Sequence, residues 1–161
     1  MTTFVAGNEL ADALRIRPSG SEGVVTDVDA YSAWVTPNSL LDVCHFLHDD
    51  PEHAYELLSS VTSVDYVEFF DVVYHLTSVS HNKASVLKVR LYGREALTLV
   101  SVTSVWAGAE LQEREIYDLM GISFHAHPNL KRLLTWEGFQ GHPLRRDYLE
   151  PPLPYTWPQG G

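Results

Sequence analysis

The sequence is poor in the residues that build redox, metal and nucleotide sites. It has one cysteine, Cys44, so no internal disulfide can form, and no CxxC pair is available for an iron–sulfur cluster or a structural zinc ion. The patterns GxGxxG and GxxxxGK[ST], which bind dinucleotides and phosphates, are absent, as is the GxSxG elbow of hydrolases. The motifs therefore indicate no catalytic or cofactor centre of these types.

Basic residues and long apolar runs are also scarce. The chain has 11 Lys and Arg against 21 Asp and Glu, a net charge of −10, which argues against nucleic acid or anionic lipid as a partner. No stretch approaches the roughly 18 apolar residues of a membrane span. Residues 1–20 lack the basic head and apolar core of a secretory signal. We therefore expect no membrane anchor in the chain itself.

The hydrophobic patterns that are present indicate helices and strands in one domain. Residues 1–20 contain a weak helical pattern, and residues 24–34 are expected to form a strand. Thr36-Pro37 predicts the start of a helix that ends before Pro51 and buries Cys44 as a small apolar residue. Four segments rich in β-branched residues are predicted to be strands: 57–66, 69–79, 85–92 and 97–106.

The order of these segments predicts an α+β fold. Successive strands with short connections indicate a mostly antiparallel sheet of four or five strands, covered on one face by the helix of residues 36–49. Residues 107–120 are predicted to form the last helix, with Gly121 at its C-terminal end. We expect residues 1–120 to form this core domain, and the 161 residues suffice for one such core.

The chain changes character after Gly121. Residues 1–120 carry 7 Lys or Arg and 18 Asp or Glu, whereas residues 121–161 carry 4 and 3. Six of the nine prolines lie in this last part, which excludes long helices and central strands. Its aromatic residues are unusual for a disordered tail. Residues 121–161 are therefore expected to form an extended segment that docks on a partner or on its own domain.

The densest charge cluster is Glu113-Arg114-Glu115 with Asp118. Two carboxylates can act as an acid/base pair, but adjacent residues of a helix point about 100° apart, so Glu113 and Glu115 should not converge. A structural role is favoured. Arg114 lies four residues from both Glu110 and Asp118, and we expect it to pair with both.

Three histidines of the last part offer an alternative, a stand-alone metal-dependent enzyme. His125, His127 and His142 have a spacing that can bind zinc, but no cysteine or helical His pair accompanies them. His127-Pro128 and His142-Pro143 fit ordered turns better. The remaining histidines share no spacing.

Two sequence elements resemble a known family. Residues 113–134 and the GHPLRRDY element of residues 141–148 match, in order and spacing, the NuoC or thirty-kilodalton subunit family of respiratory NADH:quinone oxidoreductase (complex I), which includes NdhJ-like chains. The sequence departs from the family pattern at Leu111-Gln112, where an aromatic residue is usual, and at Thr135, where Leu-Pro is common. The residues that carry the resemblance are Glu113, Arg114, Glu115, Tyr117, Asp118, Gly121, His127, Pro128, Lys131, Arg132, Gly141, His142, Pro143, Leu144, Arg145, Arg146, Asp147 and Tyr148.

The resemblance implies a non-catalytic subunit in the peripheral arm of a proton-pumping enzyme. Such subunits are cofactor-free and pack on the NuoD-like (forty-nine-kilodalton) subunit near the iron–sulfur subunits, while FMN, iron–sulfur clusters and quinone belong to other chains. The expected location is the cytoplasmic side of the inner membrane, or the matrix or stromal side in an organelle, with membrane association only through the complex. The motif residues are then expected at interfaces. The alternative within this class is the equivalent subunit of a membrane-bound hydrogenase or of a ferredoxin- or deazaflavin-dependent complex.

Overall fold

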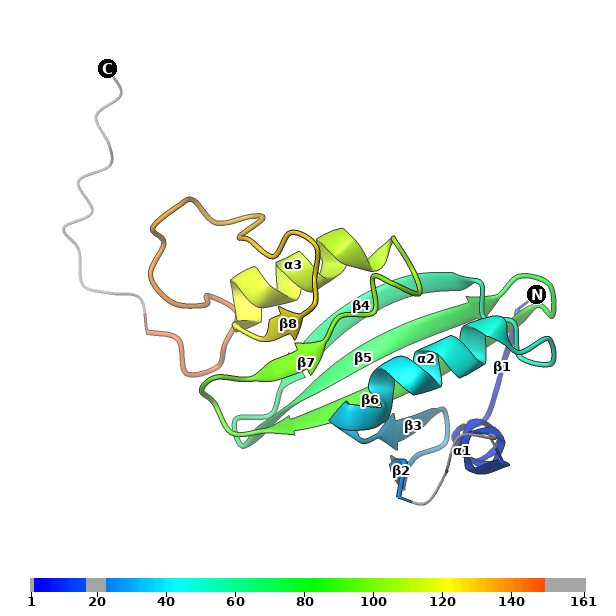
Figure 1. The fold of residues 1–161 in the computed structure, drawn as a ribbon. Helices are drawn as coiled ribbons and strands as arrows, with labels where there is room; N and C mark the ends of the chain where they lie inside the picture. Colours follow the sequence, from blue (N-terminus) through cyan, green and yellow to red (C-terminus); the bar gives the residue numbers. More distant parts are fainter. Residues whose placement is uncertain (1, 17–22, 150–161) are drawn as a thin grey trace.

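Six strands form one mixed sheet in the computed structural model, which describes residues 2–16 and 23–149. The sheet order is β2-β3-β6-β5-β4, and β1 also pairs with β6 (Figure 1). The elements in chain order are β1 Thr3–Phe4, α1 Gly7–Ile16, β2 Val25–Val28, β3 Ser32–Val35, the 3₁₀ turn η1 Pro37–Ser39, α2 Leu40–Asp49, β4 Leu57–Asp65, β5 Phe69–Ser78, β6 Lys83–Tyr92, β7 Thr98–Val100, α3 Ala109–Met120 and β8 Ser123–His125.

The three long strands β4, β5 and β6 pair in antiparallel order, as the sequence predicted. Alternate residues of β5, from Phe70 to Leu76, are fully buried and face the core. Helix α2 covers this face (Figure 1), and its buried residues Val43, Cys44 and Leu47 belong to the same core. The α+β class and the helix expected over residues 36–49 are confirmed, with Pro37 in the first turn. Within the described part of the chain, no helix is long and apolar enough to cross a bilayer.

The single strand expected over residues 24–34 is wrong, because a turn at Asp29 divides it into β2 and β3. Asp29 Oδ1 accepts hydrogen bonds from the backbone N–H groups of Tyr31 and Ser32 and from the Ser32 hydroxyl, which closes an Asx turn. Strand β3 then runs parallel to β6. With β1 as well, the main sheet has six strands, more than the expected four or five.

The long strand expected over residues 97–106 is also wrong. Only β7 is extended, and it pairs in parallel with β8 in a separate two-stranded sheet. Residues 101–106 instead turn toward α3, because Ser101 and Val102 donate hydrogen bonds to the Glu113 carboxylate. Strand β8 is a regular element inside the part of the chain for which an irregular segment was expected.

Candidate interface site

Helix α3 holds a fully buried carboxylate in its middle turn. Glu113 Oε2 accepts from the Ser101 hydroxyl at 2.6 Å, and Oε1 accepts from the Val102 N–H at 2.8 Å. Burial raises the pKa of Glu113, and these two hydrogen bonds offset only part of that rise. Glu115 is exposed on another side of the helix. The two acids do not converge, as predicted, which removes the simplest geometry for an acid/base pair.

One turn further on, Asp118 is enclosed by a loop that follows β8. Its carboxylate accepts from three successive N–H groups, those of Leu133 at 3.0 Å, Leu134 at 2.8 Å and Thr135 at 2.8 Å. Arg132 Nη1 at 2.8 Å and the Thr135 hydroxyl add two more donors. Burial disfavours the charged form, but these hydrogen bonds outweigh it and hold the pKa of Asp118 well below its ordinary value. Thr135, where the sequence departs from the family pattern, thus donates two hydrogen bonds to Asp118, one from its backbone N–H and one from its hydroxyl.

The Arg114 side chain binds the backbone of the same loop. Its Nε and Nη2 donate to the carbonyls of Lys131 and Arg132, both at 3.1 Å. The expected pairing of Arg114 with Glu110 and Asp118 is wrong, because Asp118 is taken by Arg132 and the loop amides. Arg114 instead donates to residues that are distant in sequence but close in space, because the loop carbonyls need hydrogen-bond donors.

The GHPLRRDY element caps the C-terminal end of α3. Gly121 is in the left-handed conformation with φ 73°, as predicted for the residue after the helix. The last carbonyls of the helix then accept hydrogen bonds from this element. His142 Nδ1 donates to the carbonyl of residue 118 and the Leu144 N–H to that of residue 119, and the Arg145 guanidinium donates to those of residues 120 and 121. A cation close to these carbonyls also complements the negative end of the helix dipole.

Arg94 ties this element to the sheet. Its guanidinium makes a bidentate ion pair with Asp65 at the end of β4, at 2.5 and 2.9 Å, and a second pair with Asp147. Asp65 also accepts from the Arg146 N–H at 2.9 Å. Arg94 lowers the pKa of Asp65 and lies 4.7 Å above the Phe70 ring. Sequence reasoning missed Arg94 and Asp65, because neither lies in a motif and they are 29 residues apart.

The remaining motif residues divide between packing and the surface. Gly141 has φ 80°, and a Cβ there would lie 2.9 Å from the Tyr148 ring, which stacks on Phe139. Tyr117, His127, Arg132, Pro143 and Tyr148 are partly buried. The exposed members of the predicted set are Glu115, Pro128, Lys131, Gly141, Leu144, Arg146 and Asp147.

The histidines adopt turn geometry. His127 Nε2 donates to the Glu110 carbonyl, and its Nδ1 accepts from the Asn129 N–H, so both ring nitrogens are engaged. His142 donates from Nδ1 to the Asp118 carbonyl, and His125 is exposed on β8. Within residues 2–16 and 23–149, no three His, Cys, Asp or Glu side chains converge as a metal ion would require.

These contacts define a class of protein, an α+β domain whose last helix fastens a loop-rich C-terminal segment by ion pairs and backbone hydrogen bonds. The family described as "Respiratory-chain NADH dehydrogenase, 30 Kd subunit" matches residues 33–153. The chain belongs to that family.

Curated relatives agree with this assignment. The chain is 38% identical to a subunit of the NADH-quinone oxidoreductase of Coxiella burnetii, over 86% of this chain and 76% of that protein. It is 41% identical to NADH dehydrogenase [ubiquinone] iron-sulfur protein 3, mitochondrial, of Candida albicans, over 80% of this chain and 46% of that protein. A chain of the archaeal membrane-bound sulfane sulfur reductase has the same fold, with a TM-score of 0.66 over 88% of this chain and 84% of that one, at 21% identity.

Proposed function

We propose that this chain is a non-catalytic peripheral subunit of a proton-pumping NADH:quinone oxidoreductase. Its role is to hold the quinone-reducing module together by packing on a NuoD-like subunit near the iron–sulfur subunits. FMN, iron–sulfur clusters and quinone belong to other chains of the complex. The chain attaches to the cytoplasmic side of the membrane through its partners. Membership of the NADH dehydrogenase 30 Kd subunit family supports this role, as do the relatives that are subunits of NADH-quinone oxidoreductases.

The observation that carries the proposal is a fixed segment with exposed apolar residues. The loop around Asp118 and the cap around Arg145 hold residues 126–149 in place. This segment nevertheless exposes Leu134 by 63%, Trp136 by 57% and Leu144 by 56%. Large apolar side chains on an ordered surface with arginines nearby are typical of protein–protein interfaces. A surface that is already ordered also loses little conformational entropy when a partner binds.

The experiment removes apolar surface without disturbing the buried network. We expect Leu134→Ser combined with Leu144→Ser to reduce the share of the tagged chain that co-purifies with the complex from mild-detergent membranes about tenfold or more. Both side chains are exposed, so the thermal unfolding midpoint of the isolated chain should change little. Identification of the co-purified subunits by mass spectrometry and quinone reductase activity per assembled complex complete the measurement.

A matched control uses exposed apolar residues elsewhere. Ile16 is 82% exposed at the end of α1 and Val79 is 68% exposed in the turn after β5. Ile16→Ser combined with Val79→Ser removes comparable surface and should leave assembly unchanged. Normal assembly of the Leu134/Leu144 variant would contradict the proposed interface. Normal assembly with lost turnover would instead indicate a role in the reaction itself.

A further inference from the structure

The edge of β6 is left without a neighbour over its last residues. Strand β3 pairs with β6 only as far as Val35 opposite Val89, whereas β6 continues to Tyr92. Pairing ends there because the chain turns into η1, and Pro37 has no N–H to donate to a neighbouring strand. Among the described strands, none takes the place of β3 beside the last residues of β6.

The backbone groups of Tyr92 point toward this open edge. The Ala84 carbonyl accepts from the Val5 N–H of the β1 side, so even-numbered residues of β6 direct their backbone groups away from β5. Gly93, an odd-numbered position, donates to the Glu68 carbonyl on the β5 side. By this alternation, Tyr92 presents its N–H and C=O groups to the side that β3 has left, beyond the last pair of Val35 and Val89.

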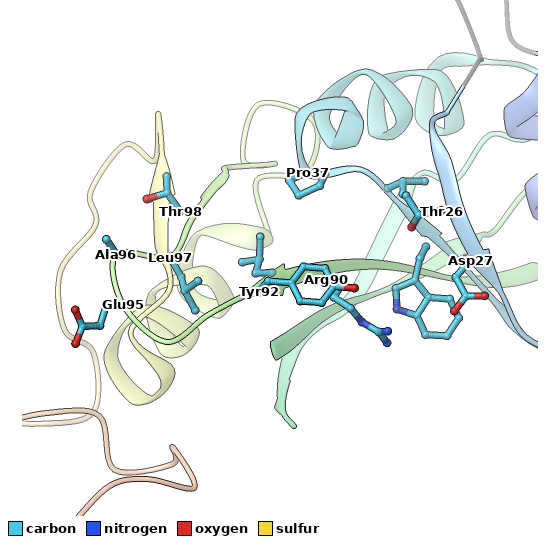
Figure 2. Close-up of a pocket in the computed structure, with 12 residues that line it drawn as sticks. Thr26, Asp27, Pro37, Arg90, Tyr92, Glu95, Ala96, Leu97 and Thr98 are labelled. Atoms are coloured by element: carbon cyan, nitrogen blue, oxygen red, sulfur yellow. The ribbon is translucent and has the colours of Figure 1, made fainter. Parts of the chain in front are cut away.

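A groove of about 590 Å³ occupies this position. Figure 2 shows Pro37 above it, Tyr92 and Arg90 in its middle, and Leu97 and Thr98 at the far side. Its floor is apolar and aromatic, and Tyr92 is 75% exposed. A short extended peptide placed here could hydrogen-bond to the edge of β6 and pack its side chains on this floor.

The charges of the groove favour a basic occupant. Asp27 and Glu95 lie at opposite ends of it (Figure 2) and both are exposed. Arg90 is the one cation among the described lining residues, and it is engaged with Asp71 through two hydrogen bonds of 2.8 Å. The groove thus offers two carboxylates that Arg90 does not neutralise. The chain's own residues 150–161 contain no Lys or Arg and would not complement these acids.

We propose that this groove binds an extended segment of a neighbouring subunit, which adds as a short strand to the open edge of β6 and brings a Lys or Arg to Asp27 or Glu95 at the acidic ends of the groove. This inference rests on the proposed function, since it needs a complex with neighbouring subunits. None of the groove's described lining residues belongs to residues 126–149, although Glu95 lies near Arg145 of that segment. Backbone pairing supplies affinity, and the acidic ends select a basic sequence.

The test uses a photo-crosslinking amino acid in the assembled complex. p-Benzoylphenylalanine replaces Thr98, which is exposed at the groove, and in a second preparation it replaces Leu134 on the proposed main interface. After irradiation, mass spectrometry identifies the attached peptides. From position 98 we expect a peptide of another subunit, with a Lys or Arg within about three residues of the attachment point.

Charge reversal tests the recognition itself. Asp27→Lys combined with Glu95→Lys should lower the crosslinking yield at position 98 about tenfold, whereas Glu52→Lys, an exposed acid outside the groove, should leave it unchanged. The inference is overturned if position 98 attaches to residues 150–161, to a second copy of the chain, to a peptide without Lys or Arg, or to nothing, while position 134 attaches to a neighbouring subunit. Failure at both positions would overturn the proposed function as well.

Discussion

The pKa values of two acids on one helix are shifted in opposite directions because their surroundings differ. Glu113 and Asp118 are both fully buried on α3. Glu113 receives two hydrogen bonds, too few to offset its burial, so its pKa is raised. Asp118 receives five donors, including Arg132, and its pKa is lowered. The direction in which burial shifts the pKa of a carboxylate therefore depends on how many hydrogen-bond donors surround it.

Asp118→Asn should destabilise the chain by about 3–5 kcal/mol, because it removes the negative charge that pairs with Arg132 and replaces one of the two acceptor oxygens with an NH2 group that cannot accept from the loop amides. Since the folded pKa of Asp118 lies below its unfolded value of about 3.9, its stabilising contribution is complete above that pH and is lost as pH falls toward the folded pKa. Urea unfolding from pH 7 to acid should show a smaller loss of stability in the variant. Glu115→Gln, an exposed change on the same helix, is the control.

Glu113→Gln should alter the pH dependence in the opposite sense. The folded pKa of Glu113 lies above its unfolded value of about 4.3, so its contribution is complete below that pH and is lost as pH rises through the folded pKa. The unfolding free energy of the unchanged protein should therefore carry a downward slope above that pH which the Gln variant lacks. Equal slopes in the two proteins would show that Glu113 is ionised without penalty.

At the scale of elements, the end of α3 depends on one glycine. Gly121 has φ 73°, and a Cβ there would lie 2.5 Å from the His142 ring and 2.6 Å from Arg145 Nη2. Gly121→Ala should cost about 1–2 kcal/mol for the left-handed backbone alone, and the displaced ring and guanidinium add to this. Thermal unfolding is the measurement. Gly108, at the other end of α3 with φ −63° and open space around its Cβ position, provides the control, since Gly108→Ala should change stability by less than about 1 kcal/mol.

The elements that the sequence predicted well are those with a strong local pattern. Helix α2, strands β4 to β6 and the end of α3 at Gly121 follow from apolar spacing, Pro37 and a glycine, all of which act within a few residues. Residues 97–106 have the same β-branched character, but only β7 is a strand, and residues 103–105 form a turn. Their conformation depends on the Glu113 carboxylate, which is remote in sequence, so β propensity alone was misleading.

At the scale of the whole molecule, Arg94 joins the sheet to the C-terminal segment. It holds Asp65 of β4 and Asp147 at the same time. Arg94→Met keeps an unbranched apolar side chain but removes the guanidinium, which makes both ion pairs and lies over the Phe70 ring. Hydrogen exchange of residues 141–149 should then become about tenfold faster, while β5 and β6 exchange at their previous rates.

Arg90→Met tests whether this effect is specific. Arg90 also makes a bidentate ion pair, with Asp71, but it lies on the central strand β6 away from the C-terminal segment. Its loss should leave the exchange of residues 141–149 unchanged. Faster exchange in both variants would indicate general destabilisation of the sheet.

The sequence by itself determined the α+β class, the family, the major helices and strands, and the expectation that residues after Gly121 lie against a surface. These follow from periodicity, from turn residues and from motifs that are continuous in the chain. Only the tertiary structure decided that β3 lies parallel beside β6, that Arg114 holds carbonyls instead of acids, and that Arg94 joins Asp65 to Asp147. The physical reason is that a hydrogen bond or ion pair depends on distance in space, and residues far apart in sequence become neighbours only when the sheet has formed.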